Sequence, residues 1–293
     1  METKKSRFSL DEDRISALPD ALIHRIFSFL DIKYVVQTCI LSRRWRYLWV
    51  SLSTLTIVDI PFIQSGDTYF VTFNRFMNFV DRLLLLRDSS DIQTLDLAWF
   101  TAKHHLDVLG KYDITDRMNT WIMAAVKHNI QELLLFIIAY EIFKLPDCFF
   151  ACKSLIKFVF CGAGMQHSGL VLPNTMHFPR LKYLAFSDVS LAVSDENTLI
   201  SKLFTNCPVL ESLLLTDCSI HLDFSSLSLK HFQLDNYDTS GPTDTTVKLR
   251  APNLISIVCK DYMSQDYSLE NLSSLVTAHI GMRVKYADED PTP

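Results

Sequence analysis

The chain has 293 residues, a net charge of -5 and a hydrophobic fraction of 48%, which together predict a folded protein with a large core. Glycine is scarce, at 7 residues, so glycine-rich phosphate-binding loops are not expected. The negative net charge argues against a general binder of DNA or RNA. The longest uninterrupted apolar run, residues 133–140, is far shorter than the ~20 residues of a membrane helix, so we expect no membrane span.

The N-terminal residues do not form a secretory signal, because their lysines are not followed by an apolar stretch. We therefore expect a protein of the cytoplasm, the nucleus or both, in which the 7 cysteines are reduced thiols. Residues 1–13 are polar, which predicts a flexible tail.

Three short helices are predicted within residues 14–50. Pro19 fits the first turn of the first helix, where its missing N–H costs nothing. The second and third helices are expected to begin after Asp31 and Ser42, whose side chains can accept a backbone N–H. Four-residue spacing predicts one apolar face on the first helix, at Leu22, Ile26 and Leu30.

A six-residue pattern, apolar-x-x-apolar-x-apolar, recurs after the helical segment. From Ile130 onward its copies begin 19 to 29 residues apart, close to the ~20–29-residue period of leucine-rich repeats. The earlier gaps between copies are longer, and within them residues 69–88 and 114–129 have the sequence pattern of amphipathic helices. Each copy predicts a strand, and neighbouring copies must stack to bury their apolar sides. The copies begin at Leu52, Ile92, Ile130, Leu155, Leu181, Leu210, Leu229, Leu254 and Leu275.

The residues that follow the predicted strands depart from a regular repeat. Regular leucine-rich repeats place Asn or Cys there, and its side chain bonds the backbone of the turn. Only Cys218 falls on that position, whereas Val189, Tyr237 and Tyr262 occupy it elsewhere. The predicted fold is therefore α/β, with a three-helix N-terminal region followed by an irregular solenoid of uneven curvature. The alternative is a set of unrelated strands in an α/β domain.

Basic and aromatic side chains alternate in LSRRWRYLWVS, residues 41–51. Such a stretch can bind nucleic acid, or it can form a helix whose rings enter a core and whose charges face an acidic partner. Residues 14–50 hold six Lys or Arg and two Asp, a balance of +4, so the rest of the chain carries -9. A basic tip on an acidic body favours the second interpretation, and no nucleic-acid partner is expected.

Several motifs in residues 15–57 occur in a fixed order: Leu18-Pro19, the helix end at residues 26–30, Val35-Val36, and Leu41-Ser42-Arg43-Arg44-Trp45-Arg46-x-Leu48-Trp49. Together they closely resemble an F-box of the plant F-box/leucine-rich-repeat family, FBD/LRR-like, and the repeats extend the resemblance over nearly the whole chain. The resemblance implies an F-box at 14–51, repeats at 52–285 and a flexible tail at 286–293. Many relatives carry a further C-terminal module, which is expected to be absent or cut short here. No flexible linker follows Trp49, so the F-box is expected to pack on the first repeats.

The resemblance implies a non-catalytic substrate-recognition subunit of an SCF-type cullin–RING ubiquitin ligase. The F-box would bind a Skp-type adaptor, and through it the cullin and RING subunits, while the repeats hold a target protein for degradation. An adaptor-binding scaffold without a role in ubiquitination is the alternative. Trp45 is also a candidate for internal packing. The residues expected to bind the adaptor are Leu18, Pro19, Leu22, Ile26, Leu30, Val36, Leu41 and Trp45.

Residues between the buried positions of each strand are expected on the exposed face of the sheet. This set mixes both charge signs with a tyrosine and a histidine, which favours a protein or peptide ligand over a small molecule. The alternative is that this face is only solvated and that loops or the C-terminal tail recognise the target. The predicted substrate-binding residues are Lys182, Tyr183, Glu211, Thr216, His231, Gln233 and Asp235.

Metal and catalytic sites find little support in the sequence. A zinc site can be drawn from Cys148, Cys152, Cys161 and His167, but paired ligand knuckles are missing and cysteine is more often a small buried hydrophobe. Nucleophile-elbow and phosphate-loop motifs are absent, and His104-His105 is expected in a solvated loop. We therefore predict no metal, no cofactor and no catalytic residue.

Overall fold

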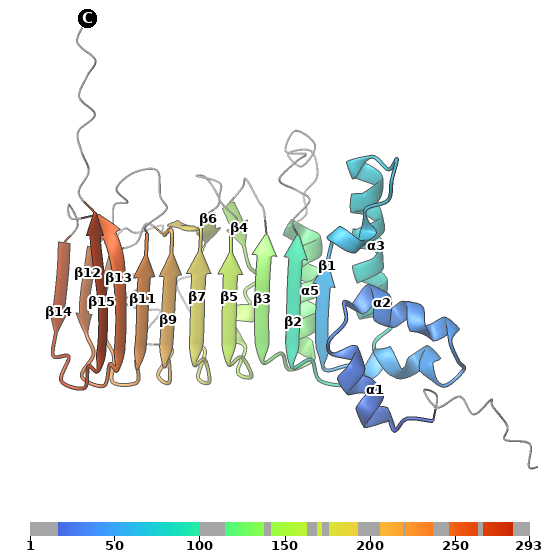
Figure 1. The fold of residues 1–293 in the computed structure, drawn as a ribbon, viewed down its shortest axis with the longest axis horizontal. Coiled ribbons are helices and arrows are strands. Elements are labelled where there is room, and N and C mark those ends of the chain that lie inside the picture. The colour runs from blue at the N-terminus through green and yellow to red at the C-terminus, as the bar shows by residue number, and fades with distance from the viewer. Residues whose placement is uncertain are drawn as a thin grey trace, which may run out of the picture.

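The computed structural model describes residues 17–99, 115–137, 142–162, 169–171, 176–192, 206–218, 221–236, 246–262 and 266–283. A helical region at the N-terminal end is followed by a nine-stranded parallel sheet (Figure 1). The expectation of a mixed α/β fold with parallel strands is therefore confirmed. The predicted tails, residues 1–13 and 286–293, lie outside the described residues.

The helical region contains two α-helices and two 3-10 segments: α1 (Asp20–Phe27), α2 (Ile32–Gln37), η1 (Thr38–Ile40) and η2 (Trp45–Ser51). Pro19 is the residue before α1 rather than part of its first turn. Its carbonyl oxygen accepts the backbone N–H of Leu22 and of Ile23. Asp31 caps α2 as predicted, and Ser42 Oγ accepts the Trp45 N–H at 3.3 Å.

The third predicted helix is a 3-10 segment, η2, rather than an α-helix. The carbonyl oxygen of Arg46 accepts the indole Nε1–H of Trp49 at 3.1 Å and the thiol of Cys39 at 3.2 Å. Side chains therefore occupy the acceptor that an α-helix would offer to the backbone four residues later. The tighter 3-10 winding follows from this local competition.

Each copy of the sequence pattern supplies one strand, which begins two residues after the leading apolar residue. The strands follow one another in chain order across the sheet, and every neighbouring pair is parallel and in register. They are β1 (Thr54–Val58), β2 (Thr94–Trp99), β3 (Glu132–Ile137), β5 (Lys157–Cys161), β7 (Tyr183–Ser187), β9 (Ser212–Thr216), β11 (His231–Asp235), β13 (Ser256–Tyr262) and β15 (Thr277–Arg283).

One hydrophobic core runs through the helical region and along the inner side of the sheet. In β7, for example, Leu184 and Phe186 are buried while Tyr183 and Ser187 are half-exposed, as strand alternation requires. Both predicted amphipathic helices are present, as α3 (Tyr69–Leu85) and α5 (Thr115–Lys127). Trp121 of α5 donates its indole N–H to Asp81 of α3 at 2.7 Å, which ties the two helices together.

Short strands form two further sheets in the later repeats. Two three-stranded parallel sheets accompany the long sheet, and their order again follows the chain (Figure 1). One contains β4 (Ile142–Lys144), β6 (Gly169–Val171) and β8 (Ser190–Ala192). The other contains β10 (His221–Ser225), β12 (Thr246–Arg250) and β14 (Asp266–Glu270). Two further 3-10 segments lie in the described part of the chain, η3 (Ile60–Phe62) and η5 (Phe149–Ala151).

The turn after β11 is held by Asn236, a residue that the sequence analysis did not single out. Asn236 is fully buried, and its Oδ1 accepts the backbone N–H of Cys218 at 3.0 Å. Its amide donates to Asp261 Oδ2 at 2.9 Å, and the Tyr267 hydroxyl donates to the same oxygen at 2.7 Å. The residue whose side chain bonds the backbone of the neighbouring turn is thus Asn236, one position before Tyr237. Tyr237 itself lies outside the described residues.

Asp31 joins the helical region to the sheet, as expected from the lack of a linker. Its Oδ1 accepts the Lys33 N–H at 2.7 Å, and its Oδ2 accepts the N–H of Val58 in β1 at 3.0 Å. Lys33 extends this joint, since its ammonium donates to the carbonyl oxygen of Pro61 and lies 4.5 Å from the centre of the Phe62 ring. One carboxylate therefore caps α2 and fixes it against the edge strand.

Replacing Asp31 with alanine should weaken this joint, because the helix cap is lost and the Val58 N–H loses its acceptor. We expect the free energy of unfolding to fall by about 1–3 kcal/mol, measured by urea denaturation followed by circular dichroism. Asp88→Ala is the matched control, because Asp88 is an exposed carboxylate whose hydrogen bonds are local, from the N–H and the side chain of Ser90. Equal, small losses in both variants would contradict the role of Asp31.

Candidate functional site

Six apolar side chains in the helical region are exposed to solvent. Phe29 and Ile40 are the most open, at 77% and 88% exposure. Isolated surface hydrophobes are ordinary, but a group of this density is a candidate protein-binding surface. We call this group the apolar tip, and it consists of Leu22, Ile26, Phe29, Leu30, Ile40 and Leu41.

The packing of α1 leaves these side chains outside. Ile23 and Phe27 are the buried residues of this helix, and the Phe27 ring meets the Trp45 ring edge-on with 5.4 Å between centroids. The wide apolar stripe of the sequence is thus divided, with one half entering the core. The other half, Leu22 and Ile26, remains available to a partner.

Two of the residues predicted to bind the adaptor point inward instead. Trp45 is 5% exposed and packs against Phe27 in the core, so its ring is not available to a partner. Val36 packs against the core and lines a cavity toward α3. Leu18 is half-buried against the core, while Pro19 is exposed.

Leu22, Ile26, Leu30 and Leu41 are exposed, and their role in adaptor binding stays a prediction. Phe29 and Ile40 were not predicted from the sequence. Phe29 lies off the four-residue spacing of the first helix, and Ile40 lies beyond that helix. Their apolar character within the helical segment was the available signal.

Basic side chains accompany the apolar tip. Arg25, Arg43 and Arg46 are exposed, whereas Arg44 forms an ion pair with Asp20. Lys33 is engaged at the joint with η3. Exposed charges of this kind chiefly raise association rates and orient an acidic partner, while apolar contacts provide most of the affinity.

The predicted substrate-binding residues lie on β7, β9 and β11 or immediately before them, and three neighbouring strands bring them together. The register pairs Tyr183 with Ser212 and Ser212 with His231, and places Thr216 beside Asp235. Gln233 lies between His231 and Asp235 on β11. These strand residues alternate with buried leucines and phenylalanines, so they share the outer face of the sheet.

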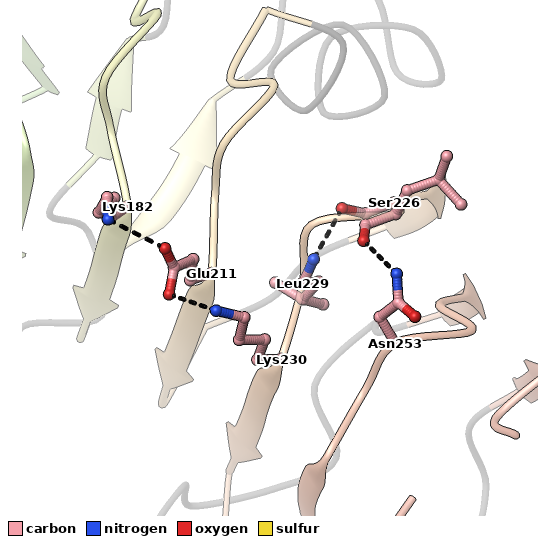
Figure 2. Close-up of polar contacts among 7 residues, drawn as sticks. Lys182, Glu211, Ser226, Leu229, Lys230 and Asn253 are labelled. Carbon is pink, nitrogen blue, oxygen red and sulfur yellow. Dashed lines mark hydrogen bonds and ion pairs between the residues drawn. The ribbon is translucent and has the colours of Figure 1, made fainter. Parts of the chain in front are cut away.

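Most of the charges in this set are already paired within the chain. The Glu211 carboxylate forms ion pairs with the ammonium groups of Lys182 at 3.1 Å and Lys230 at 2.9 Å. Side chains of three neighbouring repeats are therefore linked through one carboxylate (Figure 2). Hydrogen bonds from Lys230 and then Lys182 hold the pKa of Glu211 below its ordinary value. Lys260 and Asp235 form a further pair at 2.8 Å. The charges therefore link neighbouring repeats, and Tyr183 and His231 are the more available side chains for a ligand.

An apolar row crosses the same outer face and was missed in the sequence. Strand register aligns Leu134, Val159, Ala185 and Leu214 across β3, β5, β7 and β9, and all but the buried Ala185 are half-exposed. The sequence signal for this row was the apolar residue at an outward-facing strand position, because a face that only contacts solvent would carry polar residues there. The face can therefore offer a partner both apolar area and polar side chains.

The cysteines do not form a metal site among the described residues, where no group of three or more metal-ligating side chains is close enough to hold an ion. None of the 7 cysteines forms a disulfide. Burial raises the pKa of Cys207 and of Cys218 to about 12. Cys148 is exposed and Cys152 buried, and His167 lies outside the described residues. Within the described ranges, no helix is long and apolar enough to cross a membrane.

Comparisons with known proteins agree with this arrangement. A family model of the F-box domain matches residues 15–56. A second, described as the LRR repeats of the FBD-associated F-box protein At5g56370, matches residues 118–278. The chain therefore belongs to the F-box proteins with FBD-associated leucine-rich repeats. No solved structure matches the chain.

Curated relatives come from Arabidopsis thaliana. F-box/LRR-repeat protein At4g14103 is 30% identical over 278 residues, covering 93% of this chain and 68% of the relative. F-box/LRR-repeat protein At2g42730 is 31% identical over 284 residues, covering 93% of this chain and 57% of the relative. F-box/LRR-repeat protein At3g59200 is 29% identical over 280 residues, covering 94% and 51%. The chain thus spans about half to two thirds of the length of these relatives.

The buried position of Trp45 leads to a test of its role. Trp45→Ala should lower the free energy of unfolding by about 3–5 kcal/mol, because it removes a large side chain from the core. Tyr47→Ala, a change at an aromatic residue that is 67% exposed two positions away, should have little effect. Thermal and urea unfolding of the isolated chain check both. A fully stable Trp45→Ala protein would return this residue to the candidate contact surface.

Proposed function

We propose that this protein is the substrate-recognition subunit of an SCF-type cullin–RING ubiquitin ligase, with its F-box bound to a Skp-type adaptor and its repeats bound to a target protein. The observation that carries the proposal is the exposed apolar tip within the segment that matches the F-box model. The family to which the chain belongs supports the same role.

The proposed adaptor contact combines the apolar tip with its basic neighbours. Leu22 and Ile26 would enter apolar pockets of the adaptor, since buried anchors contribute most of the energy of an interface. Arg25, Arg43 and Arg46 would face acidic groups of the adaptor around these anchors and accelerate association. In this proposal the third helical unit of the F-box is the 3-10 segment η2, held by Trp45 and Trp49.

The proposed role of the repeats is positional, and the chain itself performs no bond chemistry. The parallel strands would form an irregular leucine-rich-repeat solenoid, which holds a target on its outer face. The Asp31 joint ties the F-box to β1, so a bound target would keep a defined position relative to the ligase. Such an arrangement raises the effective concentration of target lysines near the ubiquitin-conjugating enzyme.

Adaptor binding is tested by co-purification of the full chain with a panel of Skp-type adaptors. Ile26→Asp combined with Leu22→Asp should reduce binding at least about tenfold, because it places charges in the apolar centre of the interface. Leu85→Asp is the matched control, as Leu85 is 81% exposed on α3 and lies outside the helical region. A folded wild-type chain that binds no adaptor in the panel would refute the receptor role.

Target binding is tested by affinity capture from plant cells in which the cullin is blocked. Tyr183→Ala, Glu211→Ala and His231→Ala together should lose a specific interactor while retaining the adaptor. Thr54→Ala with Thr94→Ala is the control, because these residues lie on the outer face of the first two strands. An unchanged interactor list in the folded triple variant would exclude this face. Turnover of the captured protein separates the ligase role from that of a scaffold.

A further inference from the structure

A cavity of about 440 Å³ lies between the helical region and α3. Val36 of α2, Trp49 of η2 and Phe62 of η3 form one side. The other side is a single face of α3, because its contributing residues recur every three or four positions. They are Arg75, Asn78, Phe79, Arg82, Leu83 and Leu86, the last being the residue that ends the helix.

The walls of this cavity are apolar. The Trp49 indole N–H is already bonded to the Arg46 carbonyl oxygen at 3.1 Å, so its ring lines the cavity without an unpaired donor. Phe62 is braced by Phe79, with 5.0 Å between ring centroids. A volume of this size lies within the range of ~300–1,000 Å³ that is typical of small-molecule sites.

Two guanidinium groups line the same cavity, and they differ in how they are bonded. Arg75 donates to the Phe62 carbonyl oxygen at 3.1 Å and to Asp67 Oδ2 at 2.6 Å, so its charge is matched. Arg82 is exposed, and its guanidinium has no hydrogen-bond or ion-pair partner among the residues that the structure describes. The cavity therefore combines an apolar interior with one unmatched positive charge.

We propose that this cavity binds a small amphipathic organic anion, with its apolar body against Trp49 and Phe79 and its acidic group at Arg82. A cation would be repelled by Arg82, and a neutral apolar molecule would leave the Arg82 charge unmatched. This site goes beyond the proposed function and does not depend on it. Because both the helical region and α3 line the cavity, a bound anion stabilises the joint between the F-box and the first repeat.

The probe is decanoate, compared with decanol and decylamine as neutral and cationic molecules of similar length. Isothermal titration of the full chain should show decanoate binding at least about fivefold more tightly than decanol, with decylamine weakest. Decanoate should also raise the unfolding temperature of the chain, because it binds only the folded state.

Two variants separate the charge from the cavity. Arg82→Gln should reduce decanoate affinity to that of decanol, while Arg180→Gln, at an exposed arginine far along the chain, should leave it unchanged. Asn78→Trp should abolish binding of both probes by filling the cavity from an exposed position. Leu85→Trp, on the same helix but outside the lining, is its control.

Equal affinities for decanoate and decanol in the wild type would overturn the anionic preference. Undiminished binding in folded Asn78→Trp would place the probe elsewhere, and no binding of decanoate at millimolar concentration would remove the site altogether. Adaptor binding is not a readout here, so failure of this proposal and failure of the ligase role are distinguishable.

Discussion

Each repeat of the sheet has one apolar side that only its neighbours can cover, and this constraint organises the whole molecule. Parallel pairing in strict register aligns the buried positions of successive strands, so Leu184, Leu213 and Phe232 form one continuous row of the core. The same register brings the residues of the outer face into rows. Polar links then form between repeats, as where Lys182 and Lys230 share Glu211. Regular stacking thus produces both the core and the candidate binding face.

The first strand needs a cover that no preceding repeat supplies, and the helical region provides it. Asp31 accepts the Val58 N–H, which satisfies a backbone donor of the edge strand β1 while capping α2. The hydrophobic core continues across this contact. A sheet edge left open invites pairing with other chains, so the joint also has a structural purpose of its own. It also couples the orientation of the apolar tip to that of the sheet.

Sequence periodicity predicted much of this architecture because the period has a direct physical cause. An apolar residue followed by strand alternation specifies a strand with one buried side, and all nine main strands begin where the pattern places them. The helices over residues 69–85 and 115–127 were likewise predicted from their amphipathic sequence pattern. Local caps at Asp31 and Ser42 were predictable, because short polar side chains before an apolar run satisfy the first N–H groups.

The sequence by itself determined the family motifs, the strand positions and the set of residues on the outer face. Only the tertiary structure decided which half of the α1 stripe is buried, since Phe27 packs on Trp45 while Ile26 remains exposed. It also decided that Glu211 is paired within the chain, because that depends on strand register between distant segments. Periodicity reports that a side chain is apolar or polar, but its burial and its partners depend on which other segments pack against it.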